Sequence, residues 1–347
     1  MRVGILGGGQ LGQMLALAGR PLGLTFRFLE PAANPPAAEL GEIVQAPYDD
    51  PAALERFADG LSVVTYEFEN VPAASTHFLA ERLPVRPGPA ALAVGQDRLT
   101  ERRGLAAVGI PVSEYRAVDS TADLRAALDA LGLPLVLKTR TLGYDGKGQF
   151  VLRSADDAGP AWEAVQGRSC IAERFVPFDR ELSIVAVRGL DGEFAHYPLV
   201  QNRHEQGILH ETVAPAPDLT PSLEQRARSY ALDLMERLDY VGVIAIELFQ
   251  IGDTLLANEV APRVHNSGHW TQDGSVTSQF ENHLRAITGM PLGSTAPTGR
   301  TVMTNLIGAV GDVRGMLAEA GAHVHLYGKA PRPGRKLGHV NRVEPGA

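Results

Sequence analysis

A glycine-rich turn near the start of the chain constrains its fold more than any other segment. The run Gly7-Gly8-Gly9-Gln10-Leu11-Gly12 follows an apolar stretch at residues 2–6 and precedes a helical pattern that extends to Gly19. The spacing G-x-G-x-x-G between a strand and a helix is typical of a parallel α/β sheet that holds a phosphate at the start of the helix. We therefore predict an anion-binding turn with the Gln10 side chain at its opening. A tight turn without a ligand is the alternative.

Strand and helix patterns continue to alternate over roughly the first ninety residues. Apolar runs at residues 24–29 and 61–68 predict two more strands, and helical patterns lie around residues 54–57 and after residue 72. This alternation predicts a doubly wound parallel sheet, and therefore a protein of the α/β class. The Pro- and Gly-rich segment at residues 86–89 predicts a linker, so we assign the first domain to residues 1–94.

The remaining sequence predicts a larger α+β unit at residues 95–295 and a small mixed unit at residues 296–347. In the larger unit we expect helices at residues 97–108, 121–131 and 222–238, and strands at residues 113–118, 135–138, 149–152, 170–175, 181–187, 242–250 and 254–259. In the small unit we expect a strand at 302–307, a helix at 312–320 and a strand at 323–327.

The composition excludes several classes of protein. The 347 residues carry a net charge of −8, which argues against a protein that coats nucleic acid. Hydrophobic residues at 44% and charged residues at 21% are ordinary for a folded protein, so disorder is not expected. No apolar run reaches the ~18 residues of a membrane span, and the expected location is the cytoplasm. The single cysteine, Cys170, excludes an internal disulfide and a cysteine-based zinc site, and we expect a buried thiol.

A second glycine-rich segment, Gly143-Tyr144-Asp145-Gly146-Lys147-Gly148-Gln149, follows a predicted strand that ends at Lys138. Glycines let backbone amides approach a polyphosphate, the lysines neutralise its charge, and such a loop can close as a lid. It is not a P-loop, because glycine rather than serine or threonine follows Lys147. A simple hairpin turn is the alternative. Lys329 and Lys336 are the only other lysines, and we expect most of these four residues to serve a site.

Two glutamates lie in apolar strands that are joined by a turn. A three-residue loop centred on Asp253 would place Glu247 directly opposite Glu259. A two-residue loop at Gly252-Asp253 would instead pair Glu247 with Asn258. Two buried carboxylates this close need a cation, and oxygen ligands beside a nucleotide predict Mg²⁺.

Three further segments are rich in groups that bind ligands. Glu173-Arg174-Phe175-Val176, together with Glu181, predicts a strand edge for an adenine base and a carboxylate for ribose hydroxyls, with a solvated salt bridge as the alternative. In the polar run at 263–270, Arg263 suits a small anion such as bicarbonate. The two histidines of that run do not predict zinc, because a glycine interrupts the helical pattern and no third ligand is near. The basic segment at 329–336 predicts a phosphate contact, or a solvated tail.

These segments together resemble the ATP-grasp superfamily, and within it the N5-carboxyaminoimidazole ribonucleotide synthetase family. The resemblance covers nearly the whole chain. It rests on residues 4–12, 143–149, 258–270 and 334–339, of which the third segment is the most specific. It implies a pre-ATP-grasp first domain, a central ATP-grasp domain with a lid subdomain at about residues 113–180, a small C-terminal domain, and a homodimer.

The resemblance also implies the ligands: ATP, Mg²⁺, bicarbonate and 5-aminoimidazole ribonucleotide, with neither nucleic acid nor a membrane as a partner. The residues implied for ATP are Arg98, Lys138, Gly143, Tyr144, Asp145, Gly146, Lys147, Gly148, Gln149, Glu173, Arg174, Phe175, Val176, Glu181, His204, Asn258 and Glu259. Those implied for Mg²⁺ are Glu247 and Glu259. Those implied for bicarbonate and catalysis are Arg263, His265, Asn266 and Lys336. Those implied for the ribonucleotide, whose phosphate would take the place of NAD at the N-terminal turn, are Gln10, Leu11, Glu69, Lys329 and Arg335.

The implied reaction forms carboxyphosphate from bicarbonate and ATP, and the closed glycine loop shields that intermediate from water. The exocyclic amine then captures carbon dioxide released from carboxyphosphate, or attacks carboxyphosphate directly, and the sequence does not distinguish these two routes. His265 is a candidate proton shuttle because histidine titrates near neutral pH. One position departs from the wider superfamily. Many members have an asparagine two residues after the second metal glutamate, where this chain has Ala261, and Asn258 precedes the glutamate instead. A second metal ion would then lack one protein oxygen.

Three other functions are compatible with parts of the sequence. An NAD-dependent dehydrogenase would use the N-terminal turn, with Glu30 as the acid that binds ribose, but leaves the second glycine loop unexplained. A regulatory nucleotide-binding protein would show no turnover. A formate-dependent glycinamide ribonucleotide transformylase is the nearest alternative, and we interpret Asn266 as favouring bicarbonate over formate.

Overall fold

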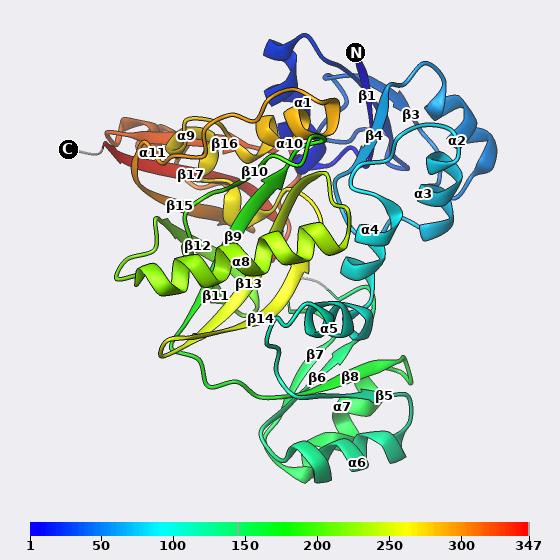
Figure 1. Cartoon of the computed structure of the whole chain (residues 1–347), viewed down its shortest axis with the longest axis vertical. Helices are drawn as coiled ribbons and strands as arrows, with labels where there is room; N and C mark the ends of the chain where they lie inside the picture. The colour runs from blue at the N-terminus through cyan, green and yellow to red at the C-terminus, as the bar shows by residue number, and fades with distance from the viewer. Residues whose placement is uncertain (144–145, 346–347) are drawn as a thin grey trace.

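The computed structural model describes residues 1–143 and 146–345, and its N-terminal unit is a parallel sheet with helices around it (Figure 1). The strands are ordered β3-β2-β1-β4, and each neighbouring pair is parallel, which confirms the predicted sheet. Its elements are β1 (Arg2–Leu6), α1 (Gln10–Gly19), η1 (Arg20–Leu22), β2 (Thr25–Leu29), β3 (Glu42–Val44), α2 (Pro51–Ala58), β4 (Val63–Tyr66), α3 (Ala73–Ala80) and α4 (Pro89–Gln96).

A small antiparallel sheet forms the lower end of the molecule in Figure 1. Its strand order is β5-β8-β6-β7, and the apolar side chains of α6 and α7 pack against it in one cluster with the buried Cys170. Burial raises the pKa of the Cys170 thiol to about 11, so this cysteine is an inert core residue, as predicted. The elements are α5 (Arg98–Ala107), which leads into the sheet, β5 (Tyr115–Val118), α6 (Thr121–Leu131), β6 (Leu135–Thr139), β7 (Gln149–Leu152), η2 (Ala155–Asp157), α7 (Ala158–Ala164) and β8 (Cys170–Arg174).

The largest sheet occupies the middle of the molecule and is antiparallel throughout. Its strands run in the order β14-β13-β9-β11-β12-β15-β17-β16, and β10 pairs with β9. The elements up to its central hairpin are β9 (Arg180–Arg188), β10 (Phe194–His196), β11 (Val200–Glu205), β12 (Ile208–Ala214), α8 (Pro221–Arg237), β13 (Gly242–Ile251) and β14 (Thr254–Ala261). The elements after the hairpin are η3 (Asn266–Gly268), α9 (Thr271–Gly274), α10 (Gln279–Thr288), β15 (Gly299–Ile307), α11 (Val313–Ala318), β16 (Ala322–Leu326) and β17 (Lys336–Pro345).

Successive residues of β9 and β13 point to opposite faces of this sheet, and each face packs against a different helix. Ile184 and Ile246 belong to the core that includes the apolar stripe of α8. Val185 and Ala245 belong to a second core that includes α10 and also reaches the N-terminal unit. Because side chains alternate along a strand, Glu247 lies on the face opposite α8. Sequence analysis did not predict α10, although this helix joins the two units.

The C-terminal residues extend the large sheet and do not form a sheet of their own. The predicted strands at 302–307 and 323–327 are present as β15 and β16, and the predicted helix at 312–320 is present as α11. Strand β17 was not predicted, and it lies between β15 and β16. As a result, Lys336 begins a strand of the sheet that also carries Glu247.

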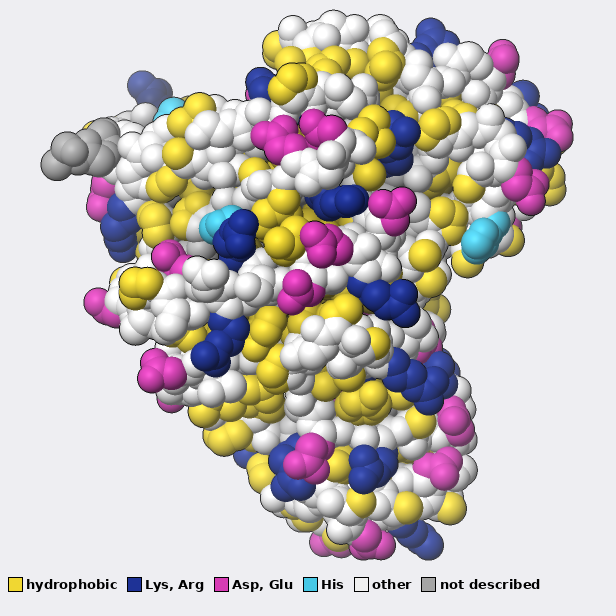
Figure 2. All heavy atoms as spheres, viewed as in Figure 1, with side chains coloured by type: hydrophobic (Ala, Val, Ile, Leu, Met, Phe, Trp, Pro, Cys, Tyr) yellow, Lys and Arg dark blue, Asp and Glu magenta, His cyan; other side chains and the backbone are white. Residues whose placement is uncertain are grey.

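Charged side chains of both signs are interspersed on the face shown in Figure 2, and no basic patch gathers there. This face therefore offers no stripe of positive charge that could follow a nucleic-acid backbone. Within the described ranges, no helix combines the length and the apolar character that a membrane crossing requires.

Candidate active site

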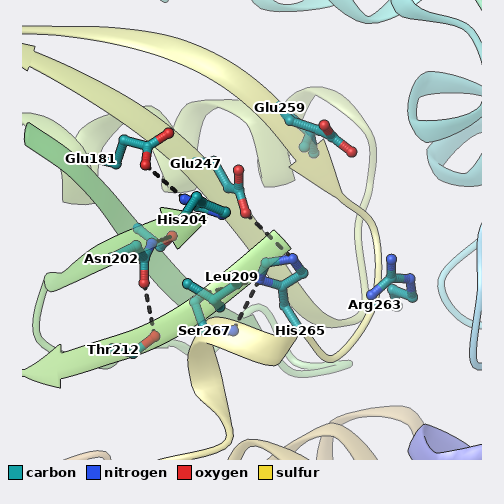
Figure 3. Close-up of polar contacts among 12 residues, drawn as sticks. Glu181, Asn202, His204, Leu209, Thr212, Glu247, Glu259, Arg263, His265 and Ser267 are labelled. Carbon is teal, nitrogen blue, oxygen red and sulfur yellow. Dashed lines mark hydrogen bonds and ion pairs between the residues drawn. The ribbon is translucent and has the colours of Figure 1, made fainter. Parts of the chain in front are cut away.

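The central feature of the site is a pair of glutamates on neighbouring strands (Figure 3). Glu247 of β13 lies directly opposite Glu259 of β14, as predicted. The predicted three-residue loop is wrong, because Ile251 pairs with Thr254 across a two-residue turn. A β-bulge corrects the register: Leu248 pairs with Ala257, which leaves Asn258 as the extra residue before Glu259.

The surroundings of the two carboxylates suit a cation. Burial raises the pKa of Glu247 to about 7, His204 opposes this rise, and the charge of Glu259 adds to it. Glu259 also forms an ion pair with Arg98 from α5, with Oε2 and Nη1 3.3 Å apart. Among the described residues, no group of three or more His, Cys, Asp or Glu side chains could hold a metal alone. This arrangement fits Mg²⁺, which is often held by one or two carboxylates together with phosphate oxygens.

Two histidines lie beside Glu247, and their pKa values are shifted in opposite directions. His204 Nδ1 is 2.6 Å from Glu181 Oε2; burial alone would lower the pKa of His204, but this hydrogen bond and the nearby carboxylates raise it. Burial holds the pKa of His265 well below its usual value, so this imidazole is neutral. The Ser267 N–H donates to His265 Nδ1, which places the ring proton on Nε2, 3.6 Å from Glu247 Oε1 (Figure 3).

The rest of the polar run after β14 is also brought to this place. Arg263 Nε donates to Glu69 Oε2 at 2.5 Å, which joins the run to the N-terminal unit. The side-chain amide of Asn266 is shielded from solvent and has no hydrogen-bond partner among the described residues. A buried amide without partners is rare in folded proteins and indicates a place for a polar ligand. The charge of Lys336 lowers the pKa of both Glu247 and His265, so Lys336 acts on the same site.

Lys138 lies in a buried network of charges that sequence analysis did not foresee. Its Nζ is 2.6 Å from Glu173 Oε2, and the other oxygen, Oε1, accepts from Arg102 Nε at 2.7 Å. Burial would raise the pKa of Glu173, but Lys138 and Arg102 lower it to about 2, so Glu173 is a carboxylate. Both of its oxygens are therefore engaged by cations. Asn258 Oδ1 lies 3.5 Å from Lys138 Nζ.

The residues expected to hold the nucleotide base and ribose are less closely grouped. Phe175 N–H donates to Pro134 O, and Val176 O accepts from Phe178 N. Arg174 forms an exposed ion pair with Glu114, so the structure does not bring its side chain to the network around Lys138.

The second glycine loop borders this network. Tyr144 and Asp145 lie outside the described residues, whereas Gly143, Gly146, Lys147, Gly148 and Gln149 are described. Gln149 pairs with Lys138 across β6 and β7. Gly146 has a φ of +72°, and a Cβ there would lie 3.1 Å from Gln206 O in the turn between β11 and β12. A pocket runs from this loop to the N-terminal unit, and its lining includes Glu69, Gln96, Arg98, Gly143 and Glu259.

The N-terminal glycine turn binds carboxylates of the chain itself. Gly9 N–H and Gly12 N–H donate to the two oxygens of Glu67, at 2.5 and 2.7 Å, and Gly8 N–H donates to Glu30 Oε2 at 2.9 Å. Burial raises the pKa of Glu67, and the two backbone donors oppose that rise. These N–H groups are the ones that a dinucleotide pyrophosphate would use, so the arrangement counts against the dehydrogenase hypothesis. It also counts against the predicted binding of a ribonucleotide phosphate by the same N–H groups, because the carboxylates of Glu67 and Glu30 already accept from them.

Two of the implied ribonucleotide residues, Gln10 and Lys329, meet from the two ends of the chain. Lys329 Nζ donates to Gln10 Oε1, and Lys329 also lies near enough to Glu67 to affect its pKa. Leu11 is buried in α1, and Arg335 Nη1 donates to Ala330 O in the segment before β17. The structure therefore brings Lys329 of the C-terminal basic segment to Gln10 at the N-terminal turn.

Three functional candidates escaped sequence analysis: Glu67, Glu101 and Arg102. A signal for Arg102 was present, because it shares a helical stripe with the buried Leu99 and Leu105. Glu67 follows β4 at the carboxyl edge of the sheet, beside the glycine turn after β1, where ligands of such sheets bind.

Comparison with known proteins covers the chain almost from end to end. Family models match a ribonucleotide synthetase preATP-grasp domain at residues 1–96, an ATP-grasp domain at 103–280 and a phosphoribosylaminoimidazole carboxylase C-terminal domain at 301–346. The N5-carboxyaminoimidazole ribonucleotide synthase of Pseudomonas aeruginosa is 52% identical over 98% of this chain and 94% of its own length. The corresponding Brucella melitensis protein is 48% identical over 99% of this chain and 96% of its own length.

Solved structures agree with this relationship. The N5-carboxyaminoimidazole ribonucleotide synthetase of Thermus thermophilus superposes with a TM-score of 0.95 at 54% identity, over 99% of this chain and 94% of that one. The Aspergillus clavatus synthase, crystallised with ADP and 5-aminoimidazole ribonucleotide, gives a TM-score of 0.92 at 32% identity, over 99% of this chain and 94% of that one. The chain belongs to the N5-carboxyaminoimidazole ribonucleotide synthetase family of ATP-grasp enzymes.

Proposed function

We propose that this enzyme is a C–N ligase that uses ATP and bicarbonate to carboxylate 5-aminoimidazole ribonucleotide, giving N5-carboxyaminoimidazole ribonucleotide, ADP and phosphate in purine biosynthesis. One observation carries the proposal. The facing pair Glu247 and Glu259 lies close to both groups of ligand-binding residues. Asn258, the residue before Glu259, contacts Lys138, and His265, which belongs to the same run as Arg263 and Asn266, lies 3.6 Å from Glu247. A phosphoryl donor and a small planar anion would thus meet at the two carboxylates. The Aspergillus relative, with its bound ADP and 5-aminoimidazole ribonucleotide, supports the same pair of substrates.

Mg²⁺ would be held by Glu247 and Glu259, and when bound it offsets the negative charge that gathers on the phosphates. Ala261 has no side-chain oxygen to add, and the Asn258 amide oxygen faces Lys138. We therefore expect the remaining ligands to come from the nucleotide and from water. Lys138, Arg98 and the backbone of the glycine loop would hold the phosphate chain of ATP.

The chemistry follows from where these charges lie. A bicarbonate oxygen, held by Arg263 and Asn266, attacks the γ-phosphorus of ATP; the bond to the bridging oxygen breaks, and ADP leaves. The product, carboxyphosphate, reacts quickly with water, so the glycine loop closes over it. The exocyclic amine of the ribonucleotide then forms the C–N bond in one of two ways. It attacks the carboxyl carbon of carboxyphosphate and phosphate leaves, or carboxyphosphate first divides into phosphate and carbon dioxide and the amine adds to the carbon dioxide; in both cases the amine loses its proton.

His265 would act in this reaction as a hydrogen-bond donor. Its Nδ1 lone pair already accepts the Ser267 N–H, and its Nε2 carries the proton that faces Glu247. No lone pair of this ring is therefore directed toward the ligands. We expect His265 to orient Glu247 or bicarbonate, and the departing phosphate to take the proton of the amine.

The family resemblance further suggests a homodimer that works in the cytoplasm. Sedimentation of the purified enzyme over a range of concentrations measures its oligomeric state. A mass of one chain at all concentrations would exclude the homodimer.

Phosphate release is the direct test of the reaction. We expect phosphate release only when ATP, bicarbonate and 5-aminoimidazole ribonucleotide are all present. We expect no release when formate replaces bicarbonate and glycinamide ribonucleotide replaces 5-aminoimidazole ribonucleotide. Release with formate and glycinamide ribonucleotide would identify a transformylase. Oxidation of NADH without ATP would identify a dehydrogenase, and no turnover with any amine ribonucleotide would indicate a regulatory protein.

A further inference from the structure

The β-bulge at Asn258 is held from outside the sheet by two adjacent residues of α5. Strand β14 is an edge strand of the large sheet. On its outer side Ala257 forms a bridge with Val112 and its N–H donates to Pro111 O at 2.8 Å, and the backbone groups that follow Ala257 are bound by side chains of α5. Arg102 Nη2 donates to Asn258 O at 2.6 Å, and Glu101 Oε1 accepts from Val260 N–H at 2.6 Å. The backbone on both sides of Glu259 is thereby bound by one pair of side chains.

These two side chains are buried and fully engaged. Arg102 is 0% exposed and Glu101 is 3% exposed. They bind each other through Nη1 and Oε2 at 2.8 Å, and the third nitrogen of the guanidinium, Nε, donates to Glu173. A buried ion pair is stable only when its remaining donors and acceptors are satisfied, and here the bulge supplies the missing partners. The geometry is that of a planar fork, which arginine provides and lysine does not.

We infer that Glu101 and Arg102 are positioning residues for the metal carboxylates: by binding the backbone on both sides of Glu259, they keep the bulge in place and hold Glu259 opposite Glu247. This inference rests on the proposed role of Glu247 and Glu259 in binding Mg²⁺. The turn alone would pair Glu247 with Asn258, as the register between the turn and the bulge shows. A slip of one residue would also carry the Glu259 side chain to the other face of the sheet.

The same guanidinium links the carboxylates to the nucleotide lysine. Arg102 binds one oxygen of Glu173, and Lys138 binds the other. Arg102 on α5 thus contacts both regions. It binds Glu173, which holds Lys138 of the small sheet, and it binds Asn258 O, next to Glu259 of the large sheet. Glu101 binds the backbone beside the bulge, and among the described residues it forms no recorded bond with Glu173. The effects of Glu101 and Arg102 can therefore be tested separately.

The test measures how Mg²⁺ affects binding of ADP to variants of α5, by calorimetry with and without the metal. We expect Glu101→Ala to lower the Mg²⁺-dependent gain in ADP affinity by roughly tenfold or more, the usual effect of removing a residue that orients a metal ligand. Metal-free binding of ADP should stay unchanged in this variant. Arg102→Met should lower both the Mg²⁺-dependent gain and the metal-free affinity for ADP. The reason is that Glu173, which holds Lys138, also loses its bond to Arg102. Arg102→Lys should not restore the loss. Arg103→Met, at the exposed neighbouring position, is the matched control and should change neither.

Hydrogen exchange provides a second readout that does not depend on metal. The Val260 amide should exchange faster in Glu101→Ala than in the wild type, while Glu101→Gln keeps an oxygen for this amide and should retain most of the protection. If Glu101→Ala does not fold, the Arg102→Lys and Arg102→Met variants carry the test. A folded Glu101→Ala or Arg102→Lys variant with an unchanged Mg²⁺-dependent gain in ADP affinity would overturn the inference. Failure of the proposed reaction would appear differently, as wild-type phosphate release that does not depend on the ribonucleotide.

Discussion

The Lys329 ammonium donates a hydrogen bond to the side-chain oxygen of Gln10, a residue 319 positions earlier in the chain. This bond joins the segment before β17 to the first turn of α1. It lies beside the Glu67 carboxylate, which occupies the N–H groups of the glycine turn. A ribonucleotide phosphate would therefore meet the Lys329 charge at the opening of the turn.

Lys329→Ala should weaken binding of the ribonucleotide and leave ATP binding almost unchanged. One charge-assisted hydrogen bond is worth about 1.5–3 kcal/mol, so the apparent KM for 5-aminoimidazole ribonucleotide should rise roughly 10- to 100-fold. Lys138→Ala should instead weaken binding of ATP and leave the apparent KM for 5-aminoimidazole ribonucleotide almost unchanged. Steady-state kinetics with each substrate varied in turn measures both effects. An equal loss of affinity for both substrates in Lys329→Ala would show that the basic segment supports the whole cleft.

Glu259→Gln should remove activity while the fold survives. The change keeps the size of the side chain and removes the charge that Mg²⁺ requires, so kcat should fall by roughly a hundredfold or more. Glu247→Gln should behave alike. The matched control is Glu236→Gln, an exposed position on α8, which should retain full activity. Near-normal turnover of Glu259→Gln at ordinary Mg²⁺ concentration would refute the metal assignment.

Gly146→Val should slow turnover and uncouple ATP hydrolysis from carboxylation. At a φ of +72° a β-branched residue is strained, and its Cβ would press against Gln206 O at 3.1 Å. Strain of about 1–3 kcal/mol, if it opposes closure of the loop, corresponds to a loss in kcat of roughly 5- to 150-fold. Gly167→Val is the control, since Gly167 has a φ of +67° but open space around its Cβ. The ratio of phosphate to carboxylated product measures coupling, and an unchanged ratio in a slow Gly146→Val enzyme would argue against shielding by the loop.

Glu173→Gln should destabilise the enzyme in a manner that depends on pH. Lys138 and Arg102 hold the folded-state pKa of Glu173 at about 2, below its ordinary value of 4.5. The stabilisation is therefore fully present above pH 4.5 and is lost as the pH falls toward 2. At pH 7 the variant leaves two buried cations short of a partner, which should cost about 3 kcal/mol. Thermal melting from pH 7 to pH 3 should show the gap between wild type and variant narrowing below pH 4.5, and a constant gap would contradict the prediction.

Local pattern was enough to predict the N-terminal parallel sheet and the pairing of Glu247 with Glu259. It was not enough to predict how that pairing arises, because the bulge depends on Arg102 and Glu101, which precede Asn258 by more than 150 residues. Glu67 was missed for a similar reason, since its partners are backbone N–H groups of another strand's turn. Buried charges are stabilised by partners from distant segments, and a single sequence does not show which segments meet.

The position of β17 has a consequence for how the enzyme is made. This strand comes after both β15 and β16 in the chain, yet it lies between them in the sheet. During synthesis, β16 has no strand to pair with until residues 336–345 have left the ribosome. The nascent chain thus carries Lys336, one of the proposed bicarbonate residues, in the segment whose arrival completes the sheet. An unfinished chain would expose the open edges of β15 and β16 to other nascent chains.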